Sequence, residues 1–250
     1  MSRLRRGLGE VSWAFGALVM CGCQVEGGPD WVVAQSIERY GGSRFVDVQI
    51  QFEFRGTPFA MTRQEGGFHY QRTVRGPDGQ MVTEVMEDGG TWAEVGGARV
   101  SLSPDEIYEV ETAVNSVIYF SFLPFRLDDG SVILRDLGSA EVAGEPYYKI
   151  EATFEQEGGG TDWDTRFVHW FHRDRLTLDY LAYSYSRDGG GSRFRRAVNR
   201  RDVGGLTIQD YENYAGDSAT RDIAELDRLY DEGALELLSM VELERVEVRR

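Results

Sequence analysis

Histidine side chains are the first candidates for chemistry in this sequence, because they bind metal ions and transfer protons. The chain contains His69, His169 and His172. A spacing of three residues places His169 and His172 on opposite faces of a strand, so they do not form a metal-binding pair. The sequence therefore predicts no metal site and no cofactor.

Two glycine-rich loops of opposite charge are the second candidate. The charged residues assigned to them are Glu157, Asp162, Asp164, Arg187, Arg193 and Arg195. Two strands and one tight turn separate the loops, so they are expected at the same end of the sheet as an ion-paired rim. Two structural hairpin turns are the alternative. A calcium site at 157–164 is a second alternative, although the spacing of its oxygen ligands differs from that of an EF-hand loop.

Lys149 is the one lysine of the chain and could be considered as a Schiff-base nucleophile. Alternation along the strand puts it on the polar face, so a solvated lysine is expected instead. The sequence contains no nucleophile elbow, phosphate-binding loop or dinucleotide-binding fingerprint. The protein is therefore predicted not to be an enzyme.

The first 22 residues have the pattern of an export signal. Three arginines precede an apolar stretch at 11–20. The segment that follows, with Gly22 before Cys23, resembles the bacterial lipobox, whose cysteine is acylated before cleavage. The sequence predicts a lipoprotein signal peptide over 1–22, lipidation at Cys23 and a short tether over 23–29. Plain secretion and a retained anchor helix are the alternatives.

An acylated Cys23 would attach the protein to a membrane of a bacterial cell envelope. Gln24 follows it, and a residue other than Asp at this place is associated with sorting to the outer membrane, on the side that faces the periplasm. The formal charge of −15 repels phosphate backbones, so no nucleic-acid partner is expected.

Residues 30–250 are predicted to form one β-rich domain, because short strand-like runs alternate with glycine-rich turns. Strands are expected at about 46–55, 58–64, 68–75, 81–87, 91–95, 98–102, 139–143, 146–156, 164–172, 176–186, 193–200, 206–209 and 234–248. Such even spacing favours an antiparallel meander over βαβ units.

Three helices are expected, at 30–40, from Ser103 to Pro124, and near 220–232. The second begins with a capping box at Ser103 and is the most apolar, so it must be covered, and the concave side of the sheet is the expected cover. The predicted fold class is mainly β (α+β): a curved antiparallel sheet or half-barrel with helices packed on its concave face.

Aromatic side chains gather at the end of the second helix and on the strand at 176–186. The residues assigned to ligand binding are Asn115, Tyr119, Phe122, Tyr180 and Tyr183. Together they would line an apolar groove with polar tips that suits a lipid or another amphiphile. A filled core is the alternative, because aromatic stripes often only pack.

Several stretches resemble the signature segments of an uncharacterised family of bacterial envelope lipoproteins. They are 115–129, 155–160, 167–170, 178–185, 189–195 and 210–214. The resemblance spans about residues 30 to 245 and implies a fold similar to the lipoprotein carriers of the LolA and LolB class, an antiparallel half-barrel with helices in its concave face. The family implies no established activity.

These observations predict a lipid-anchored envelope protein that binds a lipidic or amphiphilic ligand without catalysis. A structural or protein-interaction lipoprotein with a filled core is the main alternative, and an enzyme of unknown reaction is the third.

Overall fold

The computed structural model describes residues 27–64, 66–155, 165–185, 190–216 and 222–250. The helices are α1 (Pro29–Tyr40), η1 (Gly42–Phe45), α2 (Pro104–Ser121), η2 (Phe125–Asp128), η4 (Ile223–Glu225) and α3 (Leu226–Asp231). Within the described ranges, no helix combines the length and the apolar character that a bilayer span requires.

The strands of the described residues form two seven-stranded antiparallel sheets. In spatial order, the first sheet contains β14 (Glu244–Arg249), β1 (Val48–Phe54), β2 (Thr57–Gln64), β3 (Gly67–Arg75), β4 (Met81–Glu87), β5 (Gly90–Val95) and β6 (Ala98–Val100). The second contains β13 (Leu237–Val241), β12 (Leu206–Ala215), β11 (Gly191–Val203), β10 (Leu178–Tyr185), β9 (Phe167–His172), β8 (Glu145–Phe154) and β7 (Val132–Val142).

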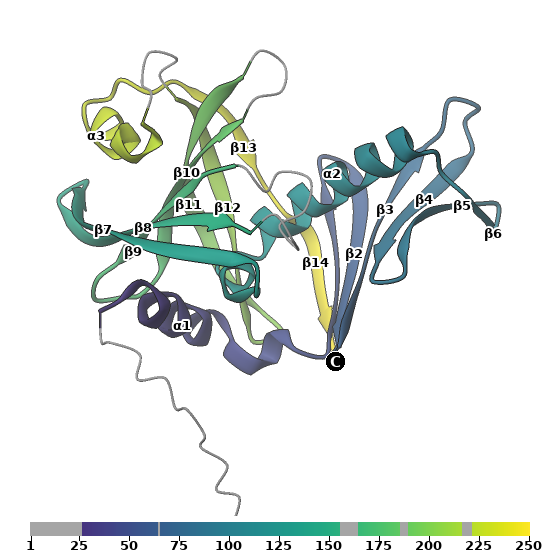
Figure 1. The fold of residues 1–250 in the computed structure, drawn as a ribbon, viewed down its shortest axis with the longest axis horizontal. Helices are drawn as coiled ribbons and strands as arrows, with labels where there is room; N and C mark the ends of the chain where they lie inside the picture. The colour runs from purple at the N-terminus through teal and green to yellow at the C-terminus, as the bar shows by residue number, and fades with distance from the viewer. Residues whose placement is uncertain (1–26, 65, 156–164, 186–189, 217–221) are drawn as a thin grey trace, which may run out of the picture.

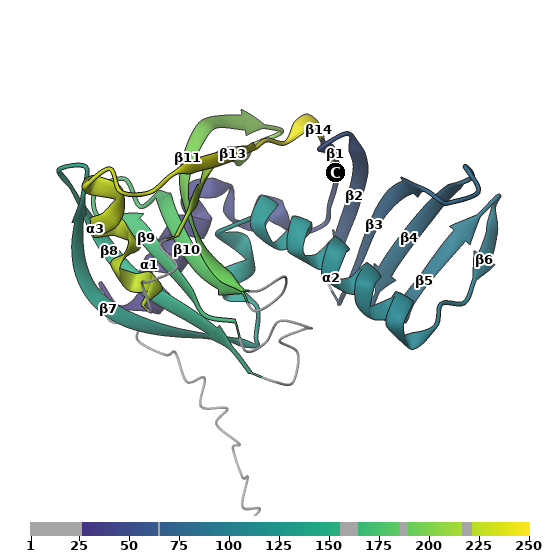
Figure 2. The same ribbon diagram turned by 90° about the horizontal axis from the view of Figure 1, so that it is seen from above.

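The two sheets lie side by side, and α2 runs along the inner side of both (Figures 1 and 2). Neither sheet closes into a barrel, so the prediction of a mainly β, open half-barrel is confirmed. The chain passes directly from β13 in the second sheet to β14 in the first, which links the two at this point (Figure 2).

The second helix forms where the sequence predicts it. The Ser103 hydroxyl accepts a hydrogen bond from the Glu106 backbone N–H, and the Glu106 carboxylate accepts one from the Ser103 backbone N–H at 2.8 Å. This reciprocal capping box satisfies two of the backbone donors that a helix start leaves free. Val110, Val114 and Ile118 recur at a spacing of four and form the buried stripe of α2.

The main core lies on the inner side of the sheets. A cluster of buried apolar side chains there draws members from α1, α2 and both sheets. Tyr40 fixes α1 against the second sheet, because its hydroxyl donates to Gln209 Oε1 at 2.7 Å and accepts from the Leu178 backbone N–H at 3.2 Å. We call the face of the second sheet that meets α1 and α2 its inner face.

The helix α3 packs on the opposite, outer face of the second sheet, whereas α1 and α2 lie on the inner side. A separate cluster of buried side chains lies beneath α3 and includes Trp170, Tyr180 and Phe194. The second sheet is therefore covered on both faces.

The prediction of a single last strand at 234–248 is wrong, because β13 and β14 belong to different sheets. The chain changes sheet at Leu243, whose backbone N–H donates to Asp210 Oδ1 at 3.0 Å and whose carbonyl accepts from Arg201 Nη2 at 2.7 Å. These side chains of the neighbouring strands take over the backbone bonds that a continuous strand would have made at this position.

The strand expected at 139–143 starts earlier, at Val132. A bulge between Asp136 and Ser139 interrupts its register with β8, and Gly138 adopts a φ of +88° there. A bulge shifts the two-residue alternation, which hides the first half of the strand from a periodicity analysis.

Candidate ligand-binding cavity

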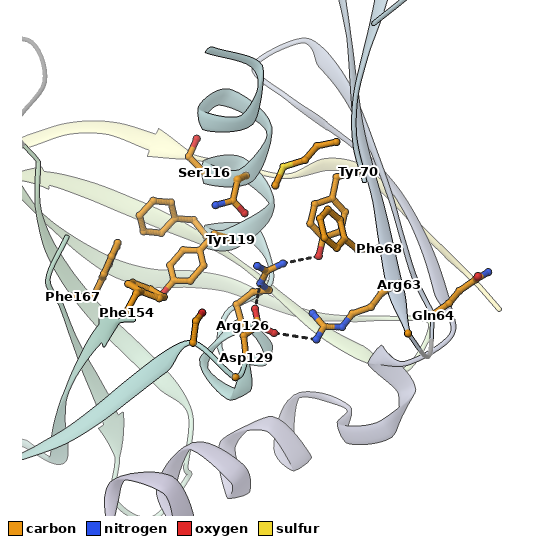
Figure 3. A pocket seen from close by; sticks show the side chains of 17 residues that line it. Arg63, Gln64, Phe68, Tyr70, Ser116, Tyr119, Arg126, Asp129, Phe154 and Phe167 are labelled. Atoms are coloured by element: carbon orange, nitrogen blue, oxygen red, sulfur yellow. Dashed lines mark hydrogen bonds and ion pairs between the residues drawn. The ribbon is translucent and has the colours of Figure 1, made fainter. Parts of the chain in front are cut away.

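A cavity of about 640 Å³ lies between α2 and the two sheets. Its apolar wall is largely aromatic and comes from four elements far apart in the sequence. The aromatic lining residues are Phe68 and Tyr70 on β3, Tyr119 and Phe120 on α2, Phe154 on β8 and Phe167 on β9. Figure 3 shows Phe154 and Phe167 on one side of the cavity and Phe68 and Tyr70 on the other.

The register of α2 places one side of the helix against the cavity. Asn115, Ser116, Tyr119 and Phe120 all line it, and their spacings of three and four residues keep them on one surface of the helix. The stripe through Val114 and Ile118 faces the core instead. One helix thus closes the core and forms a wall of the cavity.

The aromatic rings on the second-sheet side contact one another. The Phe167 ring lies 5.4 Å from Tyr119, 6.0 Å from Phe120 and 5.7 Å from Phe154, measured between ring centroids. Tilted and edge-on pairs at these distances are favourable arrangements for aromatic side chains. They make this wall a packed apolar surface.

A charged cluster stands at the first-sheet side of the cavity. Arg63 Nη2 donates to Asp129 Oδ1 at 3.0 Å, and Arg126 Nε lies 2.7 Å from Asp129 Oδ2. Arg126 Nη1 also donates to the Tyr70 hydroxyl at 2.6 Å. These contacts, dashed in Figure 3, connect β2 and β3 to the segment that follows α2. The cavity is therefore amphipathic.

The hydroxyl of Tyr119 is buried without a hydrogen-bond partner among the described residues. Burial raises the pKa of Tyr119 above its ordinary value, and the charge of Arg126 acts in the opposite direction. The group stays protonated at neutral pH and can both donate and accept a hydrogen bond. A buried hydroxyl without a partner carries a desolvation cost.

The structure brings some of the predicted binding residues to the cavity. Asn115 and Tyr119 line it. Tyr183 stands behind the wall, with its ring 4.9 Å from Phe120 and 5.8 Å from Phe167. Phe122 is buried in the core, with 1% of its surface exposed.

Tyr180 lies away from the cavity, on the outer face of the second sheet, where its ring is 5.5 Å from Tyr230 of α3. Alternation along β10 explains this position, because residues 180 and 183 differ by an odd number and must face opposite sides. We therefore leave Tyr180 out of the site.

The rim of opposite charges falls largely outside the described residues, as does Cys23. This applies to Glu157, Asp162, Asp164 and Arg187. Arg195 is described and 9% exposed, and its Nη2 donates to the Tyr183 hydroxyl at 2.9 Å. Arg193 lies over the Tyr185 ring at 4.8 Å. The ion-paired rim remains a prediction.

The histidines of β9 face opposite sides, as predicted. The His169 ring lies on the inner face between Phe167 and Phe171, whereas the His172 ring lies 5.3 Å from Tyr147 on the outer face. Burial lowers the pKa of His169 to about 3. The described residues contain no group of three or more His, Cys, Asp or Glu side chains placed to hold a metal ion.

The expectation of a solvated Lys149 is wrong. Its side chain is 15% exposed, and Nζ donates to Asp227 Oδ2 at 2.8 Å beneath α3. The strand pattern correctly gives a polar position, but a helix from the end of the chain covers that face. Lys149 is thus a structural ion-pair partner.

Sequence reasoning missed the charged cluster and four of the six aromatic lining residues, Phe68, Tyr70, Phe154 and Phe167. Arg126 and Asp129 follow the apolar helix directly, in a segment that is typical of an exposed turn. Arg63 is separated from them by more than sixty residues. Phe154 and Phe167 carry the alternation of inward-facing strand positions, which was a usable signal.

The described residues thus define an open half-barrel with an amphipathic cavity. The sequence matches a family of unknown function (DUF6503) over residues 37–243, and because this covers well over half of the chain, the chain belongs to that family. The predicted resemblance to an uncharacterised family is confirmed. Among curated proteins, no match was found.

Solved structures that are similar to this chain include a LolA superfamily protein from Nitrosomonas europaea, with 13% sequence identity and a TM-score of 0.44. This similarity covers 87% of this chain and 91% of that one. A DUF1329 family protein from Desulfovibrio piger is 14% identical, with a TM-score of 0.41 and coverage of 88% and 93%. The lipoprotein LppX of Mycobacterium tuberculosis is 12% identical, with a TM-score of 0.28 and coverage of 65% and 91%.

Proposed function

We propose that this protein binds a lipidic or amphiphilic ligand in the cavity beside α2, without catalysing a reaction. The observation that carries the proposal is the cavity itself. Its volume of about 640 Å³ falls within the range of small-molecule sites, roughly 300 to 1,000 Å³. Aromatic rings on one side and a charged cluster on the other match a molecule with an apolar body and a polar head.

A space of this size argues against the alternative of a structural lipoprotein with a filled core. A filled core would bring the aromatic rings of the two sheets into contact, because protein interiors are closely packed. In this protein, a space open to solvent separates Phe154 and Phe167 from Phe68 and Tyr70. Here the cavity coexists with a well-packed cluster around Val114 and Ile118 on the neighbouring side of the same helix. Because one side of α2 is closely packed, the space on its other side is better explained as a binding site than as poor packing.

The proposal includes an acyl anchor on Cys23 that holds the protein in a bacterial cell envelope, with the outer membrane, on the periplasmic side, as its place. It rests on the lipobox-like segment before Cys23. Labelling of the full chain with an alkyne fatty acid should depend on this cysteine. Loss of the label in Cys23→Ala supports the anchor, and unchanged labelling contradicts it.

The binding proposal is tested by filling the cavity from α2. Ser116 lines the cavity, and Ser116→Trp places an indole in the space that an acyl chain would occupy. Glu109 is an exposed residue of the same helix, so Glu109→Trp is the matched control. Both variants are made in the full chain with Cys23→Ala, and affinity for a fluorescent fatty acid analogue is measured.

We expect saturable binding by the parent chain and by Glu109→Trp, and at least about tenfold weaker binding by Ser116→Trp, since the ligand loses its place in the apolar site. Circular dichroism and thermal unfolding show whether the variants keep the fold. Equal affinity of all three proteins would contradict binding in this cavity.

A further inference from the structure

We propose that the ligand of this cavity carries an anionic head, a phosphate or a carboxylate, and that Arg126 and Arg63 bind it. The inference rests on the proposed function and deepens it by assigning the chemistry of the head. It concerns the first-sheet side of the cavity, where the two guanidinium groups share one carboxylate.

The charge balance at the cavity is the first argument. Among the described lining residues, two arginines face one acid, Asp129, which leaves an excess of one positive charge. The chain as a whole carries a formal charge of −15. A positive site kept within such an acidic protein is complementary to an anion.

Two arginines also share one carboxylate away from the cavity, because Arg135 and Arg166 both pair with Glu151. There, however, Asp222 supplies a second acid for Arg166. Among the described residues that line the cavity, Asp129 is the one acid for two arginines.

Other buried ion pairs of the described residues have one base for one acid. Arg201 and Asp210 pair one to one at 3.0 Å, and Asp210 is further satisfied by the Leu243 backbone N–H. Lys149 and Asp227 likewise pair at 2.8 Å. Those pairs join strands or cover a sheet face and are not among the residues that line the cavity beside α2, whereas Arg63 and Arg126 are.

The position of the two arginines also suits a head group. The side chain of Arg126 is 16% exposed and is held by Asp129 and by the Tyr70 hydroxyl, so its orientation is fixed before a ligand arrives. The Arg63 side chain is 32% exposed, and Asp129 holds it from the other side. Guanidinium groups bind phosphate and carboxylate through paired N–H donors, and fixed groups lose little entropy on binding.

The apolar wall across the cavity from these arginines would contact the apolar chain of the ligand. Phe154 and Phe167 stand opposite Arg63 and Arg126 (Figure 3). An anionic head at the arginines would therefore direct its chain toward the aromatic rings. Tyr119 belongs to the same wall, with its hydroxyl buried and without a partner among the described residues.

The test compares two lipids that share one acyl chain and differ in their heads. Lysophosphatidylglycerol carries an anionic phosphate, whereas monoacylglycerol is neutral and has no phosphate. Their affinities for the full chain with Cys23→Ala are measured by calorimetry, together with those of Arg126→Gln, Arg126→Lys and Arg63→Gln. Arg135 also pairs with a carboxylate but is 64% exposed and lines no part of the cavity, so Arg135→Gln controls for the loss of one positive charge. Glycerol phosphate, which lacks a chain, is the third ligand.

We expect the parent to prefer the anionic lipid by about tenfold, the size of one charge-assisted hydrogen bond. Arg126→Gln and Arg63→Gln should lower this preference, while Arg126→Lys and Arg135→Gln retain it. Unchanged affinity for monoacylglycerol in the glutamine variants shows that the fold and the apolar site are intact. The preference should also shrink as salt is added.

Equal affinity of the parent for both lipids would overturn the anionic head and leave the proposed function standing. A preference that survives in both glutamine variants would overturn the role of these arginines. Failure to bind either lipid would overturn the proposed function together with this inference. If glycerol phosphate binds as tightly as the lipid and depends on Arg126, the anion site is supported and the lipidic ligand is contradicted.

Discussion

The two faces of the second sheet carry aromatic clusters of similar composition but opposite character. On the outer face, Trp170, Tyr180 and Phe194 are closed over by α3, and the Trp170 indole donates to Asp227 Oδ2 at 2.9 Å. On the inner face, Phe154 and Phe167 border an open cavity. The outer cluster is filled and its buried polar groups are paired, as a structural core requires.

The inner cluster departs from that pattern in three ways. It leaves a space of about 640 Å³, it buries the Tyr119 hydroxyl without a described partner, and it borders two arginines that share one acid. Of these, the buried hydroxyl without a partner costs stability unless another polar group compensates for it. The comparison assigns structural support to the outer face and the proposed ligand binding to the inner face.

The largest expected effect is a loss of stability from a substitution in the outer cluster. Trp170 is 0% exposed, so Trp170→Ala should lower the free energy of unfolding by about 3 to 5 kcal/mol. Phe154→Ala, at the partly exposed cavity wall, should cost less than about half of that but weaken binding of a fluorescent fatty acid analogue. Urea denaturation and ligand titration of both variants measure the two effects. Equal stability losses would remove the distinction between the faces.

A second effect concerns pH and the two histidines of β9. Burial lowers the pKa of His169 to about 3, below the value of about 6.5 for an unfolded chain. The unfolded state then binds the proton first, so the stabilising contribution is complete above about pH 6.5 and is lost as the pH falls toward 3. This loss amounts to at most about 4 kcal/mol.

His169→Leu should therefore reduce the fall in stability between pH 6.5 and pH 3. His172, on the outer face, differs from His169 in having a carboxylate partner: its Nε2 lies 2.9 Å from a Glu145 carboxylate oxygen. Urea denaturation at several pH values compares the parent and the variant. An unchanged pH dependence in His169→Leu would show that this group does not titrate from a buried site.

The third effect compares the ion pairs of the two faces. Asp227→Asn leaves Lys149 largely buried without its counter-charge and should cost about 3 kcal/mol of unfolding free energy. Asp129→Asn, at the more exposed cavity cluster, should cost about 1 kcal/mol or less. The same variant should strengthen binding of lysophosphatidylglycerol, because it removes a negative charge beside the proposed head-group site. Denaturation and calorimetry test both statements, and weaker binding would count against the charge argument.

Much of the fold could be predicted from the sequence because local residue patterns determine many of its elements. The capping box at Ser103, the buried stripe of α2 and the alternation in β1 each fix an element from residues close together in the chain. The strand at Val132–Val142 was only half predicted, since the bulge near Gly138 interrupts that alternation. The last strand was predicted as one because its division depends on Asp210 and Arg201, which are distant in sequence.

The candidate site was less predictable, because it depends on which faces meet. The location of Asn115 and Tyr119 at the cavity could be predicted from the position of α2. To place Tyr180 and Lys149 correctly, one must know which face of the sheet α3 covers. The charged cluster joins Arg63 to Arg126 and Asp129 only after both sheets have formed. No periodicity within one element encodes such a contact.

The most direct test of the central claim is to locate a bound acyl chain on the protein. A fatty acid with a diazirine at the end of its chain is bound to the full chain with Cys23→Ala, activated by light, and mapped by mass spectrometry of the resulting peptides. We predict that the label falls on 115–120, Phe154 and Phe167, and that Ser116→Trp reduces it. Label on α3, on the exposed Leu237 and Leu238 of β13, or in amounts that do not saturate, would contradict a ligand-binding cavity on the inner face.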